Sequence, residues 1–237
     1  MKRLIIKIIT ILLILLIVFS IYKIGDKFYD YHKAGDIYSD IKDSYKPLDN
    51  DKNEYKSFSD INSDYRFWIS VENTNIDYPV VQGKDNSFYL NKDVYKEVLS
   101  SGSIFLDYRN DYTSDDNIII YGHNMKNKTM FSALENFKDK NFFNENNKII
   151  IQDYDNKYIY EVFSAYFVDA NFDYLDVNFN DKDDFEEYIN TVSSKSLTNS
   201  NIDVTSNDKI ITLSTCSYEG SDTRTIVHGK LIEVVPN

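Results

Sequence analysis

The sequence predicts a mostly β domain, a barrel or a sandwich with helices added, that follows a membrane-spanning helix. Three observations support this prediction. From about residue 58 onward, short β-type segments are separated by turns. These segments show neither βαβ alternation nor a glycine-rich phosphate-binding loop, which argues against a parallel α/β fold. The first 24 residues are predominantly apolar and contain no acidic residue.

The composition is that of a folded domain. Apolar residues make up 42% of the 237 residues and aromatic residues 15%, which excludes a disordered chain despite 27% charged residues. Only 7 Gly and 3 Pro are present, so collagen-like and flexible-linker sequences are excluded as well. A single Cys excludes intrachain disulfides and cysteine-based zinc clusters, and leaves one thiol that is either inert or functional.

The first apolar segment is long enough to cross a bilayer. Residues 4–22 read LIIKIITILLILLIVFSIY, and Lys7 is their one charged residue. Nineteen helical residues span about 28 Å, close to the ~30 Å of a hydrocarbon core. Because signal-peptide cleavage requires small residues and the first Ala is Ala34, a retained anchor over residues 1–24 is favoured over a cleaved leader.

Charge around this segment predicts its orientation. The basic residues Lys2, Arg3 and Lys7 lie at its N-terminal end, so the positive-inside rule places the N-terminus in the cytoplasm and the chain after Lys23 outside. The chain as a whole has a net charge of −12. Four basic residues lie in 1–24, which leaves 22 basic and 38 acidic residues, a net charge of −16, for the remainder. A domain this acidic argues against a nucleic-acid partner.

Residues 25–57 are predicted to form a juxtamembrane helical segment. An apolar stripe with spacings of three, four or seven marks one helix face, and its members are Phe28, Tyr31, Tyr38, Ile41 and Tyr45. Pro47 and the polar run after it end the pattern. The segment is either a stalk or a helix that packs on the following domain.

Eight strands are predicted in the domain of residues 58–237. They cover 66–72, 76–82, 102–108, 117–122, 148–154, 157–170, 209–216 and 225–234. Pro79 favours an edge position or a bulge for the second strand. Helical patterns occupy residues 130–137 and 184–197.

Cys216 ends the strand KIITLSTC and is the candidate nucleophile. Period-two alternation places it on the more polar strand face, together with Thr212 and Ser214. A free Cys is most often a small buried apolar residue. Polar neighbours and an exported, oxidising location favour a thiol that is used for chemistry instead.

A nucleophilic thiol needs a proton-shuttling partner, and the chain has three His. His32 lies in the juxtamembrane stripe. His228 lies inside a strand and is interpreted as a histidine on a solvated strand face. His123 follows the apolar strand NIIIY and Gly122, which permits a sharp turn, so His123 is the favoured partner.

Arginine is rare in this chain, with 4 Arg against 22 Lys. A guanidinium directs two donors at one oxygen, which suits a peptide carbonyl or an oxyanion. Arg224 follows Cys216 by eight residues, and a hairpin over the intervening loop brings the two side by side. The alternative role is a surface salt bridge to Glu219 or Asp222.

The candidate nucleophile and histidine lie in the segments TLSTC at 212–216 and YGHNM at 121–125. Together with Arg224 and the N-terminal anchor, these segments resemble the sortases, cysteine transpeptidases of Gram-positive cell surfaces. The resemblance covers roughly residues 58–237. The DYRN segment at 107–110 and the segment FWISVENTNIDYPVVQ are most similar to class B sortases. The resemblance implies a closed eight-stranded β-barrel with added helices.

The resemblance also implies a mechanism and a set of partners. Cys216 is expected to attack the carbonyl after the Thr of a C-terminal sorting signal and form a thioacyl enzyme. His123 is expected to move protons and Arg224 to hold the oxyanion or the substrate backbone. An amine of a peptidoglycan precursor then resolves the intermediate, and surface proteins with sorting signals are the substrates.

Substrate contacts are expected at Ser214, on the same strand face as Cys216, and at Thr215. No cofactor or metal is expected. Three acidic residues, Asp111, Asp115 and Asp116, lack the ligand spacing of a calcium loop and are interpreted as a solvated loop.

Two other functions remain open on the sequence. A papain-type cysteine hydrolase is one, although its usual order of Cys before His is reversed here. A non-catalytic anchored surface protein is the other, and it predicts an ordinary, unreactive thiol at Cys216.

Overall fold

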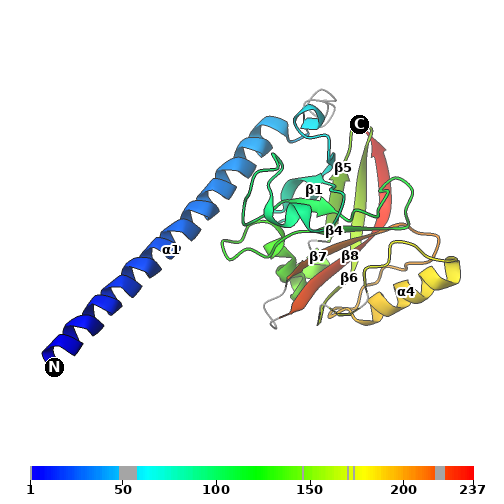
Figure 1. The fold of residues 1–237 in the computed structure, drawn as a ribbon. Coiled ribbons are helices and arrows are strands. Elements are labelled where there is room, and N and C mark those ends of the chain that lie inside the picture. Colours follow the sequence, from blue (N-terminus) through cyan, green and yellow to red (C-terminus); the bar gives the residue numbers. More distant parts are fainter. Residues whose placement is uncertain (1, 48–57, 146, 170, 173, 217–221) are drawn as a thin grey trace.

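A computed structural model describes residues 2–47, 58–145, 147–169, 171–172, 174–216 and 222–237. Eight strands close into a barrel in the order β1-β2-β3-β4-β7-β8-β6-β5 (Figure 1). Their bounds are Tyr65–Val71 (β1), Asp77–Val81 (β2), Ile104–Leu106 (β3), Asn117–Tyr121 (β4), Lys148–Gln152 (β5), Asn156–Asp169 (β6), Ile210–Cys216 (β7) and Thr223–Pro236 (β8). The eight predicted strands are therefore confirmed.

Two neighbouring pairs in the barrel, β2–β3 and β4–β7, are parallel, and the other pairs are antiparallel. Of the edge position or bulge predicted from Pro79, the edge position is wrong, because a closed barrel leaves β2 a neighbour on each side. The β1–β2 ladder does shift register, but on β1, between Tyr65 and Phe67. Pro79 is tolerated since the pairing with β3 involves only Val80 and Val81, so Pro79 lies just outside this ladder.

The apolar side chains form two clusters. Inward-facing residues of the barrel, among them Ile211 and Leu213 of β7, form the larger one. The second cluster lies between the outer face of β6–β8 and the helix α4 (Lys182–Ser194) and includes Phe185 and Val192. This layer corrects the interpretation of His228: it is fully buried, because the second cluster covers the strand face that the sequence suggested to be solvated.

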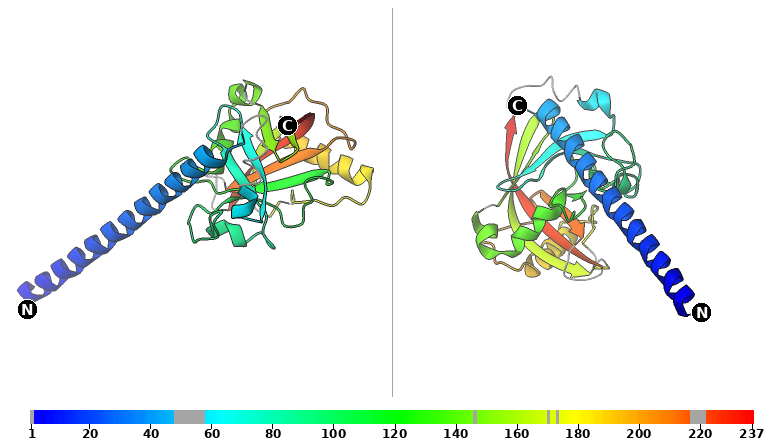
Figure 2. Two further views of the ribbon diagram at one scale, coloured as in Figure 1. Left: turned by 90° about the horizontal axis from the view of Figure 1, so that it is seen from above. Right: turned by 90° about the vertical axis from the view of Figure 1, so that its left-hand side faces the viewer.

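The N-terminal helix α1 (Lys2–Tyr45) is a single element. The sequence pattern divides this region into an anchor and a juxtamembrane helix, whereas the structure makes the two continuous (Figures 1 and 2). The first part of α1 is long and apolar enough to cross a membrane and is exposed along its length. The projection of this part away from the barrel is clear in both views of Figure 2.

The last turns of α1 pack on the barrel. Ala34, Tyr38 and Ile41 are buried in the barrel cluster, and the Tyr38 hydroxyl donates to the carbonyl oxygen of Gly102 over 2.7 Å. Lys42 and Lys46 lie 2.6 and 2.7 Å from the carboxylate of Asp77 at the start of β2. Of the two options left open, the packed helix is therefore the correct one.

The remaining helices are short. The predicted helix at 130–137 is a 3-10 helix, η2 (Phe131–Lys138), followed by α3 (Lys140–Glu145). The 3-10 helix η1 (Phe88–Asn91) is not indicated by the sequence pattern. The predicted helix at 184–197 is α4, whose N-cap Asp181 accepts hydrogen bonds from the amides of Asp183 and Asp184.

Candidate active site

Three adjacent strands bring the candidate residues to one end of the barrel. The parallel strands β4 and β7 are in register at Tyr121 and Ser214, so His123 and Cys216 each lie two residues beyond a paired position. The Gly122 amide donates to the Ser214 carbonyl over 3.2 Å and extends this register. Because parallel strands end at the same side of a sheet, the turn that carries His123 lies beside the end of β7.

Arg224 lies on the other side of β7. In the antiparallel β7–β8 pair its Cα is opposite that of Cys216, as the predicted hairpin requires. Its Nη1 lies 3.3 Å from the carboxylate of the exposed Asp222 and 3.1 Å from the Thr223 carbonyl. The alternative surface salt bridge is thus present as well, and its exposed position leaves it weak. The side chain of Cys216 and all of Glu219 are outside the described residues.

The imidazole of His123 has a fixed orientation. Its Nε2 lies 2.7 Å from the carbonyl oxygen of Leu90 in η1. A carbonyl oxygen only accepts hydrogen bonds, so Nε2 carries the hydrogen and Nδ1 is left to exchange a proton. Gly122 is needed before this turn, because a Cβ there would overlap Ile104 and the ring of Phe131.

A pocket of about 320 Å³ lies between these elements. Four of the five predicted site residues line it, namely His123, Arg224, Ser214 and Thr215. The fifth, Cys216, ends the strand that carries two of them. The other lining residues are Asn86, Leu90, Phe105, Tyr121, Gly122, Tyr174 and Leu175. Of these, Tyr174 shares a hydrogen bond of 2.9 Å with the Ser214 hydroxyl.

Most of these further lining residues cannot be found from the sequence. Leu90 belongs to a four-residue 3-10 helix, and Tyr174 and Leu175 lie in the β6–α4 connection, which has no helix or strand over residues 174–179. No local periodicity marks them, because the fold alone brings them to the pocket. The sequence does mark some of the others, because Tyr121 and Gly122 belong to the YGHNM segment and Phe105 lies in the predicted strand 102–108. The DYRN segment gives a further hint, since its Asp107 accepts hydrogen bonds from Tyr121 and Asn86.

The other two histidines do not line the pocket. His32 is exposed on α1 and does not line the pocket. His228 shares hydrogen bonds of 2.9 Å at both ring nitrogens, with Thr212 and with Tyr166. Complete burial lowers the pKa of His228 to about 3, so it is neutral at physiological pH and has a structural role in the second cluster.

The acidic residues of the 111–116 loop make local contacts. Asp111 caps its own turn by accepting from Thr113, and Asp115 accepts from Asn110 and from the amide of Asp111. Among the described residues, no group of three or more His, Cys, Asp or Glu side chains is arranged to hold a metal ion.

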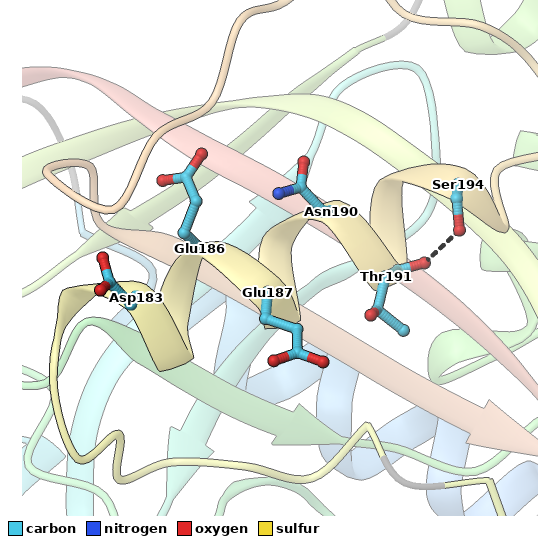
Figure 3. Close-up of a pocket in the computed structure, with 6 residues that line it drawn as sticks. All are labelled: Asp183, Glu186, Glu187, Asn190, Thr191 and Ser194. Carbon is cyan, nitrogen blue, oxygen red and sulfur yellow. Dashed lines mark hydrogen bonds between the residues drawn. The ribbon is translucent and has the colours of Figure 1, made fainter.

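A second surface hollow lies on the outward face of α4. Its side chains are acidic or neutral polar: Asp183, Glu186, Glu187, Asn190, Thr191 and Ser194 (Figure 3). They follow one another along the helix, and the bond drawn among them is that of the Ser194 hydroxyl to the Thr191 carbonyl. None of the candidate catalytic residues lines this hollow.

Comparison with known proteins identifies the fold and the family. The sortase domain model matches residues 69–232. The chain belongs to the sortase family. This sortase is 34% identical to sortase B of Listeria monocytogenes, over 95% of this chain and 96% of the relative, and 35% identical to sortase B of Staphylococcus aureus, over 99% of each.

Solved structures give the same result. A mutant form of Clostridium perfringens sortase B is similar with a TM-score of 0.79 and 43% identity, covering 83% of this chain and 97% of that one. The substrate complex of Staphylococcus aureus sortase B has a TM-score of 0.80 and 32% identity, covering 86% of this chain and 99% of that one. The sortase is therefore a class B-like cysteine transpeptidase with the eight-stranded barrel of these enzymes.

Proposed function

We propose that this sortase cleaves a C-terminal sorting signal after a Thr and transfers the surface protein to an amine of a peptidoglycan precursor. One observation carries the proposal: the register of β4, β7 and β8 groups His123 and Arg224 around the strand end that bears Cys216. A nucleophile, a proton carrier and an oxyanion donor are the groups that acyl transfer requires.

We assign the first half-reaction as follows. The thiolate of Cys216 attacks the carbonyl carbon after the Thr, and the carbonyl electron pair moves onto oxygen. Arg224 stabilises this oxyanion, since a guanidinium keeps its charge and directs two donors at one oxygen. The C–N bond then breaks as His123 donates a proton to the leaving amine, which leaves a thioester on Cys216.

The second half-reaction reverses these roles. An incoming amine attacks the thioester carbonyl, and His123 accepts the proton that this amine loses. The C–S bond breaks, the thiolate of Cys216 is regenerated, and a new amide joins the surface protein to its acceptor. We assign Ser214 and Thr215 to substrate contact because both line the pocket beside the strand end.

The location follows from the anchor. We propose that residues 1–24 form a cytoplasmic tip and a single membrane span, that 25–57 lead to the barrel, and that residues 58–237 form the catalytic domain outside the cell. The candidate span and the basic residues before it support this orientation. Substrate and a lipid-linked acceptor then meet the enzyme at the outer membrane face.

The test uses the full chain in detergent micelles and a panel of quenched fluorescent peptides, each with a Pro, a Thr and an amide bond after the Thr. We expect cleavage by the wild type and an amide product when an amine is added. We expect Cys216→Ala and His123→Ala each to abolish peptide cleavage and formation of the amide product. The matched control is His32→Ala, which removes an imidazole from α1, outside the pocket, and leaves the rate unchanged.

Each alternative function has its own signature in this experiment. A hydrolase yields only the acid product whether or not amine is present. A non-catalytic surface protein cleaves no peptide, and its Cys216 reacts with a thiol probe no faster than free cysteine. Full activity in either the Cys216→Ala or the His123→Ala variant contradicts the proposal.

A further inference from the structure

Arg109 in the DYRN segment links the β3–β4 connection to the pocket wall. Its Nε and Nη2 donate to the two carboxylate oxygens of Asp107 over 2.9 Å each. The same Nη2 also donates to the carbonyl oxygen of Leu175 over 2.8 Å. Arg109 is not itself among the residues that line the pocket, but Leu175 is.

Asp107 is the centre of this arrangement. Its side chain is fully buried, and its Oδ2 accepts hydrogen bonds of 2.9 Å from the Tyr121 hydroxyl and from the Asn86 amide, both of which line the pocket. Burial by itself raises the pKa of Asp107, but the hydrogen bonds from Arg109, Tyr121 and Asn86 outweigh burial, and the pKa lies below its ordinary value. A bidentate pair with Arg109 therefore keeps a buried carboxylate charged and in place.

The wall that Arg109 contacts has no secondary structure of its own. Residues 174–176 lie in an irregular connection, and a side chain from a different element donates to each of their carbonyl oxygens. The Tyr188 hydroxyl of α4 donates to Tyr174 over 2.9 Å, and Asn117 of β4 donates to Asp176 over 2.8 Å. Arg109 supplies the middle bond, to Leu175.

We propose that Arg109, held by Asp107, is a positioning residue that fixes the Tyr174–Leu175 wall and thereby sets the affinity for the sorting peptide. This inference rests on the proposed function of the pocket. Without the middle bond, the wall samples more conformations, and binding must then restrict them at a cost in affinity. Arg109 lies outside the pocket that His123 and Arg224 line, so the bond-breaking steps are left largely as they are.

The test compares Arg109→Gln with a matched variant, Lys230→Gln. Lys230 also joins a carboxylate, that of Asp208, to a backbone carbonyl, that of Asp203, but lines no part of the pocket. We expect the KM of Arg109→Gln for the best peptide of the panel to rise about ten-fold, because the substitution removes a hydrogen bond from a charged donor. We expect its kcat to change less than about two-fold, and both constants of Lys230→Gln to stay at the wild-type values.

Alkylation of Cys216 by iodoacetamide separates positioning from general damage. This small reagent does not depend on the wall, so its rate with Arg109→Gln is expected to equal that of the wild type. An unchanged KM overturns the inference, and so does a fall in kcat and alkylation rate together with the rise in KM, which is the mark of a merely structural role.

A second variant covers the case in which Arg109→Gln does not fold. Tyr188→Phe keeps the ring in the second cluster and removes the hydroxyl, which donates to the neighbouring carbonyl of Tyr174 and accepts from the Asn117 amide over 3.2 Å. We expect a KM increase of about five-fold, the value of one neutral hydrogen bond, and an unchanged KM here also overturns the inference. If the wild type cleaves no peptide, the proposed function fails and this inference fails with it. If the wild type cleaves the peptide but the substitutions leave KM unchanged, the inference alone fails.

Discussion

The carbonyl oxygen of Leu90 lies 2.7 Å from Nε2 of His123, although 33 residues separate them in the chain. This contact sets both the plane of the imidazole and the nitrogen that carries the hydrogen. Gly102 lies directly against this carbonyl, because a Cβ at Gly102 would lie 2.4 Å from its oxygen. The proposed proton carrier therefore depends on a short 3-10 helix whose position a glycine permits.

Gly102→Ala is expected to disturb this contact. Gly102 has a φ of 55°, and a Cβ there overlaps the carbonyl oxygens of Leu90 and Tyr89. We expect the free energy of unfolding to fall by about 1–3 kcal/mol and kcat to fall more than KM rises, measured by urea denaturation and peptide cleavage. Gly35→Ala is the control, because its Cβ meets no atom within 4 Å; equal effects of the two substitutions contradict the prediction.

Arg224→Lys is expected to lower kcat about 100-fold, the usual effect of losing an oxyanion donor. The lysine keeps the charge and the contact with Asp222 but presents no planar fork to a second oxygen. Steady-state cleavage of the best peptide measures the loss. If Arg224 serves only in its surface salt bridge, the lysine variant retains wild-type kcat.

His228 predicts a specific dependence of stability on pH. Burial lowers its pKa to about 3 in the folded state, whereas the unfolded value is about 6.5. Its neutral form thus stabilises the fold above pH ~6.5, and this contribution is lost as the pH falls from about 6.5 towards 3. Within that range, the free energy of unfolding of the wild type should decrease about 1.4 kcal/mol per pH unit more steeply than that of His228→Gln. Parallel profiles for the two proteins would show that His228 is not buried in its neutral form.

Asp77→Asn tests the attachment of α1 to the barrel. Burial raises the pKa of Asp77, but hydrogen bonds from Lys42, Lys46 and Trp68 outweigh burial and lower it below the ordinary value. The charged carboxylate therefore stabilises the fold above pH ~4 and loses this effect as the pH falls through its lowered pKa. Because the two lysines are partly exposed, we expect a loss of about 1 kcal/mol at pH 7. Urea denaturation should show that the difference in free energy of unfolding between variant and wild type is smaller at low pH than at pH 7. A difference that is the same at both pH values argues against the ion pairs as its cause.

Much of the fold is encoded in local patterns. The strands are rich in β-branched and aromatic residues, and the alternation in β7 separates Ile211 and Leu213, which face the barrel interior, from Thr212 and Ser214 on the other face. The candidate membrane span and the apolar stripe of α1 are equally local, since apolar length and helical spacing depend on the sequence alone. The predicted division between them coincides with Gly25, a residue type that often follows a helix end, but α1 continues through it.

The candidate site divides in the same way. Cys216, His123 and Arg224 stand out in the sequence because nucleophiles, imidazoles and guanidiniums are chemically distinctive and rare in this chain. Their grouping is a consequence of the β4–β7–β8 register, which pairs strands that are distant in the chain. Leu90, Tyr174 and Leu175 are ordinary residues in irregular segments, and only the closed barrel brings them to the pocket.

The sequence by itself determined the candidate membrane-spanning segment, the eight strands and the candidate catalytic residues, because periodicity and side-chain chemistry are properties of short stretches of chain. The tertiary structure alone decided that His228 is buried, that α1 runs unbroken onto the barrel, and that Arg109 reaches the carbonyl of Leu175. Each of these depends on which surfaces of distant segments cover one another, and a pattern within one segment does not name the segment that covers it.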